Sequence, residues 1–266
     1  MNRYAVISCD AKPDYSFPIP ITAASWAHLG YGVIAYLIGD VPRITVSVLY
    51  DIGARVLFMD ADPCYPEHYT SKCIRFFAHQ NAYDDDVLIT GDADMLMLSK
   101  EYMDQYDESA DMTMWYSNAY DGTQWEPRYP LCHIGAPASV WNDVIPHATV
   151  HRFLDEYAEF GEEPNGNFSD ELIFKEVLKT WDGYPDRCCF LKREQKNAMG
   201  PYGRYDRSYW RSDRTGLIDA HTPRPAYTDE AWPTVKALIR DCMPEYLTML
   251  DEYRNYYCED LGIHIG

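Results

Sequence analysis

The first half of the chain alternates regularly between short, continuously apolar runs and segments with helical character. The apolar runs are Arg3–Cys9, Gly32–Gly39, Ala54–Met59 and Asp86–Thr90. Strands that are covered on both faces read as continuous apolar runs, whereas strands with one wet face alternate. Strands that alternate with helices form mostly parallel sheets with right-handed crossovers. The alternation therefore predicts an α/β fold: a mixed, mostly parallel sheet flanked by helices.

The second half is less regular, and no linker or repeat divides the chain. Further strands are expected at 110–117, 130–134 and 216–219, and a long loop rich in Gly, Pro, Tyr and Arg at 194–215. The expected helices span 22–29, 42–52, 66–82, 137–145, 148–160 and 169–181, with two more in 229–258 split at Pro244. We expect a single domain over 1–266. Its parts are a nucleotide-binding half (about 1–100), an acceptor and catalytic half (about 110–224) and C-terminal helices (225–266).

The charge of the chain restricts its partners. The net charge is −19, from 42 acidic and 23 basic residues. Such a chain repels a phosphate backbone, so we expect no nucleic-acid or anionic-membrane partner. The segment from Arg187 to Arg224 differs, because it holds nine Lys/Arg and four Asp/Glu. A basic segment in an acidic protein suits a small anionic ligand.

Neither the N-terminus nor any internal run suggests a membrane or secretory protein. No apolar run reaches the roughly 18 residues of a transmembrane helix, and the N-terminal residues lack the apolar segment of a signal peptide. We therefore expect a cytoplasmic protein whose eight cysteines are free thiols. Because no C-x-x-C pair occurs, the sequence predicts no structural zinc site.

Asp92 and Asp94 are the strongest candidate metal ligands. They follow the expected strand 86–90 directly, in VLITGDADML. Ligands of open α/β sheets bind at the carboxyl ends of strands, and residues two apart in an extended chain project the same way. Carboxylate oxygens favour Mg²⁺ or Mn²⁺, with phosphate oxygens completing the shell. Asp60-Ala61-Asp62 and Asp84–Asp86 repeat the pattern less convincingly, because solvated acids in turns are common.

A histidine and a basic loop could complete this site. His221, in LIDAHTPRP, follows a short apolar run and supplies an imidazole for Mn²⁺. Arginines bind phosphate with two hydrogen bonds, so the loop before it is a candidate lid over a diphosphate. Its arginines are Arg204, Arg207, Arg211 and Arg214. A solvated histidine and a solvated basic loop are the alternative interpretations.

Other candidates come from helix starts and strand ends. Asp170 and Glu171 begin a helix in NFSDELIF. They either act at the reaction centre or complement the helix dipole after Ser169. Arg75 could reach a nucleotide, or pair on a helix surface. His133 and Gly135, in CHIGAP, could line the pocket.

The order of these motifs resembles that of the GT-A type of glycosyltransferase over roughly residues 3–224. SWAHLGYGVIAYLIGD is similar to the first helix and second strand of that family, and DVLITGDADML is similar to its strand ending in D-x-D. HIGAP resembles the segment where donor sugar and acceptor meet, SDEL the acidic catalytic element, and IDAH the late histidine that joins the metal.

The resemblance implies a role for each residue. Asp94 and His221 would ligate Mn²⁺ or Mg²⁺, and Asp92 would hold the metal or the donor ribose. Asp170 or Glu171 would act at the anomeric centre, with inversion and retention both open. The residues implied near the nucleoside or its phosphates are Cys9, Asp10, Asp40 and Arg75. The reaction would move a sugar from a nucleoside diphosphate sugar, UDP before GDP, to a hydroxyl of a glycan or glycoprotein.

Three other functions compete with this interpretation. A haloacid dehalogenase-type phosphatase has a D-x-D that continues with x-Thr or x-Val, whereas Met95-Leu96 follow here. A sugar nucleotidylyltransferase needs a glycine-rich loop after its first strand, and SCDAKPD has no glycine. A non-catalytic protein that binds sugar or nucleotide remains possible on the same residues.

Overall fold

The computed structural model describes residues 2–123, 128–163, 167–193, 203–207 and 217–263. Its main sheet contains seven strands in the order β3-β2-β1-β4-β7-β6-β8 within these ranges. They are β1 (Arg3–Cys9), β2 (Gly32–Ile38), β3 (Arg55–Met59), β4 (Val87–Thr90), β6 (Met112–Trp115), β7 (Ile134–Pro137) and β8 (Cys188–Leu191). Only β7 runs antiparallel to its neighbours there. The expected mixed, mostly parallel α/β sheet is confirmed.

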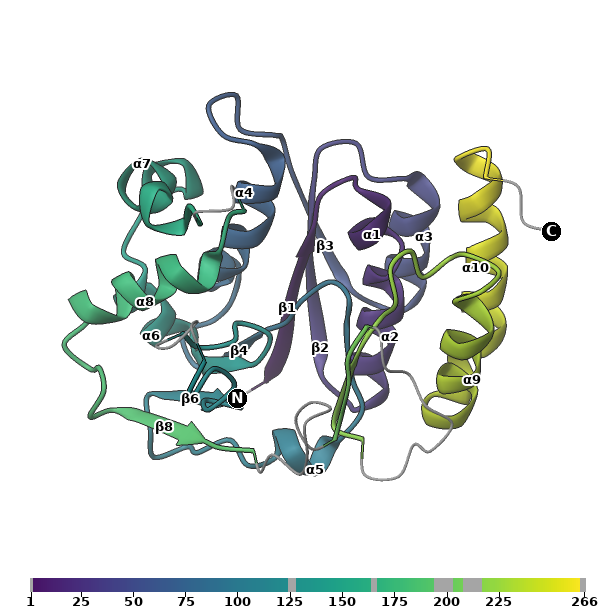
Figure 1. The fold of residues 1–266 in the computed structure, drawn as a ribbon. Helices are drawn as coiled ribbons and strands as arrows, with labels where there is room; N and C mark the ends of the chain where they lie inside the picture. Colours follow the sequence, from purple (N-terminus) through teal and green to yellow (C-terminus); the bar gives the residue numbers. More distant parts are fainter. Residues whose placement is uncertain (1, 124–127, 164–166, 194–202, 208–216, 264–266) are drawn as a thin grey trace.

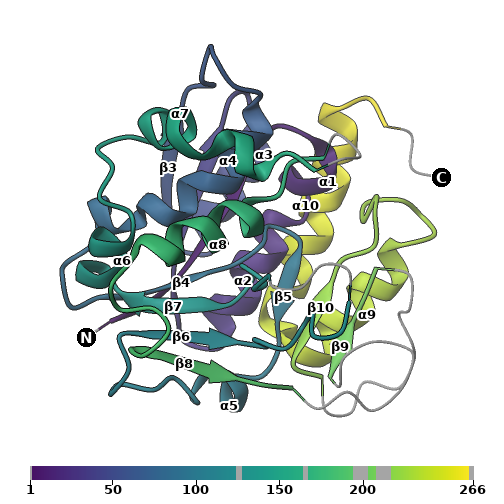
Figure 2. The ribbon, with the colours of Figure 1, turned by 60° about the vertical axis from the view of Figure 1, so that its left-hand side comes forward.

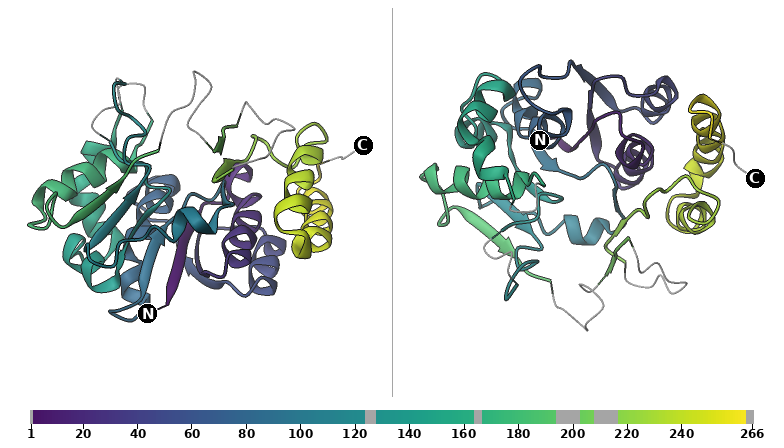
Figure 3. Two further views of the ribbon diagram at one scale, coloured as in Figure 1. Left: turned by 90° about the horizontal axis from the view of Figure 1, so that it is seen from below. Right: turned by 45° about the horizontal axis from the view of Figure 1, so that its top comes forward.

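Helices cover both faces of this sheet (Figure 1). They are α1 (Pro13–Ser16), α2 (Ile19–His28), α3 (Arg43–Asp51), α4 (Glu67–Cys73), the 3-10 helix η1 (Ile74–Asn81), α5 (Lys100–Met103), α6 (Ala138–Val144), α7 (Val150–Gly161), α8 (Asp170–Thr180), α9 (Trp232–Cys242), the 3-10 helix η2 (Pro244–Tyr246) and α10 (Leu247–Asp260). Helices α4, α6, α7 and α8 lie on one side, and α2 and α3 on the other, with α9 and α10 outside them (Figures 1 and 3). No helix among the described residues combines the length and apolarity that crossing a membrane requires.

Aromatic side chains fill the core on both sides. Phe76, Trp141 and Phe174 pack together beneath α6 and α8, with ring centroids 5.5–6.1 Å apart. On the opposite side, Phe17 stacks on Tyr253 at 5.3 Å and joins α10 to the sheet layer. Burying a side chain such as Phe contributes about 1.5–3 kcal/mol, so these clusters hold the helices at fixed positions around the strand ends.

A second, smaller sheet lies beside the main one (Figure 2). It consists of β5 (Met95–Met97), β9 (Arg204–Tyr205) and β10 (Asp219–His221), in the order β5-β10-β9. Strand β10 is antiparallel to β5, which places His221 opposite Met95. This pairing brings a late segment of the chain back to the residues that follow β4.

Several predicted elements differ in extent or kind from the observed ones. The helix expected at 66–82 turns from α to 3-10 geometry after Cys73. The strand expected at 130–134 was wrong: residues 131–133 form a turn, and β7 begins at Ile134. Leu131 and Cys132 are buried in that turn. Their apolar side chains therefore indicate a buried segment and not an extended strand. Strand β8 was missed because its side chains are only half-buried.

A buried ion network connects the small sheet to the main sheet. Asp219 of β10 accepts hydrogen bonds from Arg193 at 2.6 Å and Arg204 at 2.8 and 2.9 Å. His133 Nε2 lies 3.0 Å from the same carboxylate. Burial alone would raise the pKa of Asp219, but the two guanidinium groups outweigh it and hold that pKa well below its ordinary value. Asp219 is therefore charged, and its arginines depend on it for neutralisation.

Removing this charge should destabilise the protein strongly. Asp219→Asn would leave two buried guanidinium groups without a counter-charge, and breaking a buried ion pair costs about 3–5 kcal/mol. Urea unfolding measures the loss. The control is Asp241→Asn, because Asp241 is exposed and pairs with its chain neighbour Arg240 on the surface. If the two variants had the same free energy of unfolding, the expected contribution of the Asp219 network to stability would be contradicted.

Candidate functional site

A pocket opens at the carboxyl ends of β1 and β4. These strands are neighbours in the sheet, and the strand order reverses between them. From β1 the chain continues to β2 and β3 on one side, and it then crosses to β4 on the other side of β1. Ligands of open α/β sheets bind at such a switch point. The pocket is lined by Ser8, Asp10, Tyr15, His68, Ser71, Lys72, Arg75, Asp92, Ala93, Asp94, Asp170, Glu171, Arg207 and Arg224.

The structure brings Asp92, Asp94 and His221 together at the end of β4. One ligating atom of each lies within 4.8 Å of those of the other two. The small sheet is the cause, because His221 pairs with Met95 and the Thr222 N–H donates to the Asp94 carbonyl at 2.8 Å. Two carboxylates and an imidazole suit Mn²⁺ or Mg²⁺.

His221 is protonated in the metal-free protein. Burial would lower its pKa, but Asp206 and Asp92 outweigh this and raise the pKa of His221 to about 9. Its Nε2 lies 3.9 Å from Asp92 Oδ2, and its Nδ1 3.4 Å from Asp206 Oδ1. An imidazole binds metal in its neutral form, so a cation at this site has to displace that proton.

Arg75 is the centre of the pocket wall. It is 6% exposed, and its Nη1 donates to Asp92 Oδ1 at 2.6 Å and to the Gly91 carbonyl at 2.9 Å. Its Nη2 donates to Asp170 Oδ2 at 2.5 Å. Burial would raise the pKa of Asp92, but Arg75 holds it well below its ordinary value. The guanidinium thus fixes one aspartate from β4 and another from α8.

Two further arginines neutralise Asp94. Arg207 Nη2 and Arg224 Nη2 donate to its Oδ2 at 2.8 and 2.7 Å. The guanidinium of Arg224 also lies over the Tyr15 ring, 4.5 Å from its centroid. With Lys72 and Arg75, these residues give the pocket four cationic side chains. Arg207 was predicted from the sequence for this role, whereas Arg224 was not, although it comes only three residues after His221.

Asp170 and Glu171 occupy different environments at the start of α8. Asp170 is bound by Arg75, whereas both Glu171 carboxylate oxygens accept from the Tyr120 hydroxyl at 2.9 Å. Burial and the neighbouring Asp170 raise the pKa of Glu171 to about 8. Glu171 therefore holds a proton near neutral pH and can exchange it, while Asp170 is committed to the arginine. No sequence signal pointed to Tyr120.

Most of the remaining predicted residues lie outside the pocket. Cys9 is fully buried in the core, and Asp40 is exposed beyond the end of β2. Gly135 packs against Trp115, whose ring atoms would lie 2.9 Å from an added Cβ. His133 and Arg204 belong to the Asp219 network.

Of the other predicted residues, one lies in the pocket and two lie outside the part of the chain that the structure describes. Asp10 does line the pocket. Its Oδ1 accepts from the Lys12 N–H at 3.1 Å. Its Oδ2 is buried without a hydrogen-bond donor and lies 3.8 Å from Lys12 Nζ. Arg211 and Arg214 lie outside the described residues.

Comparison with known proteins gives matches to solved structures alone. No protein-family model matches the chain, and no curated protein does. The chain is similar to the glycosyltransferase GlyE of Streptococcus pneumoniae TIGR4, at 12% identity and a TM-score of 0.46, with 72% of this chain and 46% of that chain covered. It therefore spans less than half the length of GlyE. Glycosyltransferases recur among the other similar structures.

Two of these cover the chain more fully. The galactosyltransferase LgtC, in complex with donor and acceptor sugar analogs, gives 12% identity, a TM-score of 0.49 and 95% coverage of both chains. Glucosyl-3-phosphoglycerate synthase of Mycobacterium tuberculosis, in complex with phosphoglyceric acid, gives 12% identity and a TM-score of 0.44. It covers 91% of this chain and 80% of that one.

The raised pKa of Glu171 should appear in the stability of the protein. In the unfolded chain this carboxyl ionises near its ordinary value of 4.5, and in the folded protein only near 8. Between these values the folded state keeps a proton that the unfolded chain releases, so the free energy of unfolding falls as the pH rises. Glu171→Gln cannot ionise, and its melting temperature should rise relative to the wild type from pH 4.5 to 8. Each kcal/mol corresponds to about 2–4 °C.

Glu176→Gln is the matched control, since Glu176 lies on the same helix and pairs with the exposed Lys179. A constant difference between Glu171→Gln and the wild type over this pH range would show that Glu171 ionises normally.

Proposed function

We propose that the protein is a metal-dependent glycosyltransferase. It transfers a sugar from a nucleoside diphosphate sugar, UDP in preference to GDP, to a hydroxyl of a glycan or glycoprotein. One observation carries the proposal: Asp92, Asp94 and His221 meet at the end of β4, in a pocket that also holds four cationic side chains. Oxygen and imidazole ligands for a divalent cation, beside guanidinium groups, match the chemistry of a diphosphate leaving group.

The cations of the pocket would bind the diphosphate. Arg207 and Arg224 form two hydrogen bonds each to one oxygen of Asp94, and phosphate oxygens offer the same geometry with more charge. A bound diphosphate would therefore take these donors from Asp94 and free its carboxylate. Arg75 has its hydrogen bonds committed to Asp92 and Asp170, so it orients those carboxylates.

The donor set fits a hard divalent cation. Asp92, Asp94 and His221 would hold Mn²⁺ or Mg²⁺, which would supply charge to stabilise the departing diphosphate. Asp92 is ionised beside Arg75, and Asp94 becomes available once the arginines turn to the diphosphate. His221 would have to release its proton to the solvent before it binds the cation. Because the diphosphate frees Asp94 for the cation, and the cation adds positive charge beside the diphosphate, each ligand would favour the binding of the other.

The nucleoside would lie over the end of β1. Asp10 offers there a buried carboxylate oxygen without a hydrogen-bond donor, which suits a ribose hydroxyl or a base N–H. Tyr15 and His68 add ring surfaces beside it. Such a site supports a nucleotide ligand more strongly than a free sugar phosphate.

The acceptor would approach from an adjoining pocket. That pocket shares six lining residues with the first: Tyr15, His68, Lys72, Asp170, Glu171 and Arg224. It continues past Arg128, Glu163, Asn167, Phe168 and Ser169. Phe168 stacks on Tyr69 with ring centroids 3.6 Å apart and is only 3% exposed, so it closes one wall of this pocket. Glu171 lies where the two pockets meet.

Glu171 would act as the proton acceptor for the attacking hydroxyl. The base is its ionised form, the minor one at neutral pH, which a pKa of about 8 makes a stronger base than an ordinary glutamate. The Tyr120 hydroxyl holds it in place. Asp170 cannot serve equally, because its charge is bound to Arg75. A carboxylate that takes the acceptor proton corresponds to the inverting course.

One observation favours a second candidate, a nucleotide-binding protein without transferase activity. Asp94 is already neutralised by Arg207 and Arg224, so the pocket can be balanced in charge with no metal. Such a protein would bind a nucleoside diphosphate equally well with Mn²⁺ and with EDTA, and would leave the nucleotide sugar intact.

Metal-dependent nucleotide binding should require Asp94. UDP or GDP with Mn²⁺ should raise the melting temperature of the wild type, because a ligand that binds only the folded state stabilises it, and EDTA should abolish the effect. Asp94→Asn should remove the Mn²⁺-dependent part. A lost charged contact is worth about 1.5–3 kcal/mol, or about 10- to 100-fold in Kd.

The chain supplies its own control for this experiment. Asp60→Asn changes an exposed aspartate of the other Asp-Ala-Asp sequence, which lies outside the pocket, and it should bind like the wild type. A full Mn²⁺-dependent shift in Asp94→Asn would contradict the proposed metal site.

Transfer should depend on Glu171 more than binding does. Glu171→Gln should lower kcat by about 10²- to 10⁴-fold, the usual contribution of general base catalysis, with little change in Kd for the nucleotide. Release of UDP or GDP from nucleotide sugars in the presence of sugar acceptors measures the rate. An unchanged kcat would exclude Glu171 as the base.

A further inference from the structure

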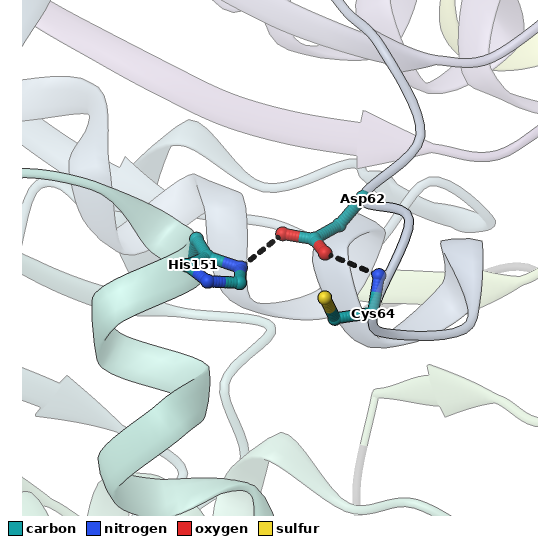
Figure 4. Close-up of side chains that lie close together, drawn as sticks. All are labelled: Asp62, Cys64 and His151. Atoms are coloured by element: carbon teal, nitrogen blue, oxygen red, sulfur yellow. Dashed lines mark hydrogen bonds and ion pairs between the residues drawn. The ribbon is translucent and has the colours of Figure 1, made fainter.

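A second cluster of metal-ligating side chains lies outside the pocket. Asp62 and Cys64 belong to the segment between β3 and α4, and His151 is the second residue of α7. One ligating atom of each lies within 4.8 Å of those of the other two. Figure 4 shows the Cys64 sulfur directed toward the space between the Asp62 carboxylate and the His151 ring.

The local structure fixes two of the three ligands. Asp62 Oδ1 accepts the Cys64 N–H at 2.8 Å, which closes a tight turn, and Asp62 Oδ2 lies 2.8 Å from His151 Nδ1. The Asp62 side chain is 8% exposed and His151 42%. All eight cysteines lie in the described ranges, and Cys64 is the one exposed among them, so an ion can reach its sulfur from solution.

Further residues orient the histidine from its other side. Asp155, one turn along α7, lies 3.5 Å from His151 Nε2. Asp155 in turn accepts the Tyr65 hydroxyl at 3.0 Å, and the Tyr65 ring packs edge-on against His151 with centroids 5.9 Å apart. A carboxylate behind a ligating histidine is the arrangement that fixes its tautomer and raises its basicity in zinc sites.

We propose that Asp62, Cys64 and His151 bind Zn²⁺. The ligand set of one thiolate, one imidazole and one carboxylate is the N/S/O chemistry that Zn²⁺ accepts in tetrahedral sites, with a solvent molecule as the fourth ligand. A thiolate and a carboxylate balance the charge of the ion. The set differs from that of the pocket, where Asp92, Asp94 and His221 supply no sulfur and suit harder cations.

The bound ion would join two parts of the chain. Asp62 and Cys64 come just before α4, which carries Lys72 into the pocket, and His151 comes from α7 on the outside of the same layer. In the metal-free structure the hydrogen bond between Asp62 and His151 and the one from Tyr65 to Asp155 hold this connection. A metal bond from three side chains would hold it more firmly and raise the stability of the folded chain.

The sequence alone could not predict this site. The expectation of no structural zinc site rested on the absence of a C-x-x-C pair, but here the thiol and the imidazole are 87 positions apart in the chain. Only the packing of α7 against α4 brings them together.

Cobalt substitution tests the proposal with a signal that the pocket cannot give. The full-length protein, reduced and free of metal, is titrated with Co²⁺ in the presence of excess Mg²⁺. We expect a thiolate-to-cobalt charge-transfer band at one equivalent, which one equivalent of Zn²⁺ removes. Cys64→Ser should lack the band, whereas Cys189→Ser, which changes a half-buried cysteine outside the cluster, should keep it.

Zinc affinity and stability complete the test. Zn²⁺ should raise the melting temperature of the wild type and of Cys189→Ser but not of Cys64→Ser. Asp155→Asn should weaken zinc binding by about 10- to 100-fold, as loss of a supporting carboxylate does, and keep the cobalt band. If Cys64→Ser keeps the band, or if the wild type shows none, the cluster is an ion pair beside an uninvolved thiol and the proposal fails.

Discussion

The buried guanidinium of Arg75 is the interaction on which the pocket depends. It comes from η1 and lies between the end of β4 and the start of α8, with Asp92 on one side and Asp170 on the other. A buried cation is tolerated only when it is paired and hydrogen-bonded, and these two aspartates satisfy it together with the Gly91 carbonyl. The same contact distinguishes the two adjacent acids. Asp170 is the counter-charge of Arg75, whereas Glu171 does not pair with Arg75 and has a raised pKa.

The charges of the pocket are balanced in a way that prepares it for a ligand. Arg207 and Arg224 both donate to Asp94 Oδ2, and His221 carries a proton between Asp92 and Asp206. A diphosphate would draw the arginines away, and a divalent cation would replace the proton and complete the neutralisation of Asp92 and Asp94. In the proposed function, neither ligand binds well alone, since each leaves charges of one sign unmatched. This coupling separates a transferase from a protein that holds a nucleotide on arginines alone.

The sequence predicted the half of the fold whose signal is local. The strand at Arg3–Cys9 has the expected bounds, because a strand buried on both faces is visible in the sequence as a continuous apolar run. It also singled out Asp92, Asp94 and His221, which the structure brings together. It could not show which distant partners a residue meets. Arg204, predicted to cover a diphosphate, is held by Asp219, and Gly135, predicted near a sugar, packs against Trp115. Neither partner can be read from the spacing.

The two Asp-Ala-Asp sequences show how context decides chemistry. Asp60-Ala61-Asp62 and Asp92-Ala93-Asp94 are identical, and each comes just after a parallel strand. Strand β4 ends beside β1 at the switch point of the sheet, so its acids meet arginines and the histidine of β10. Strand β3 is at the edge of the sheet, so Asp62 meets instead the thiol two residues on and a histidine from α7. Hard oxygen chemistry at the first place and proposed sulfur chemistry at the second follow from strand order, not from the motif that both share.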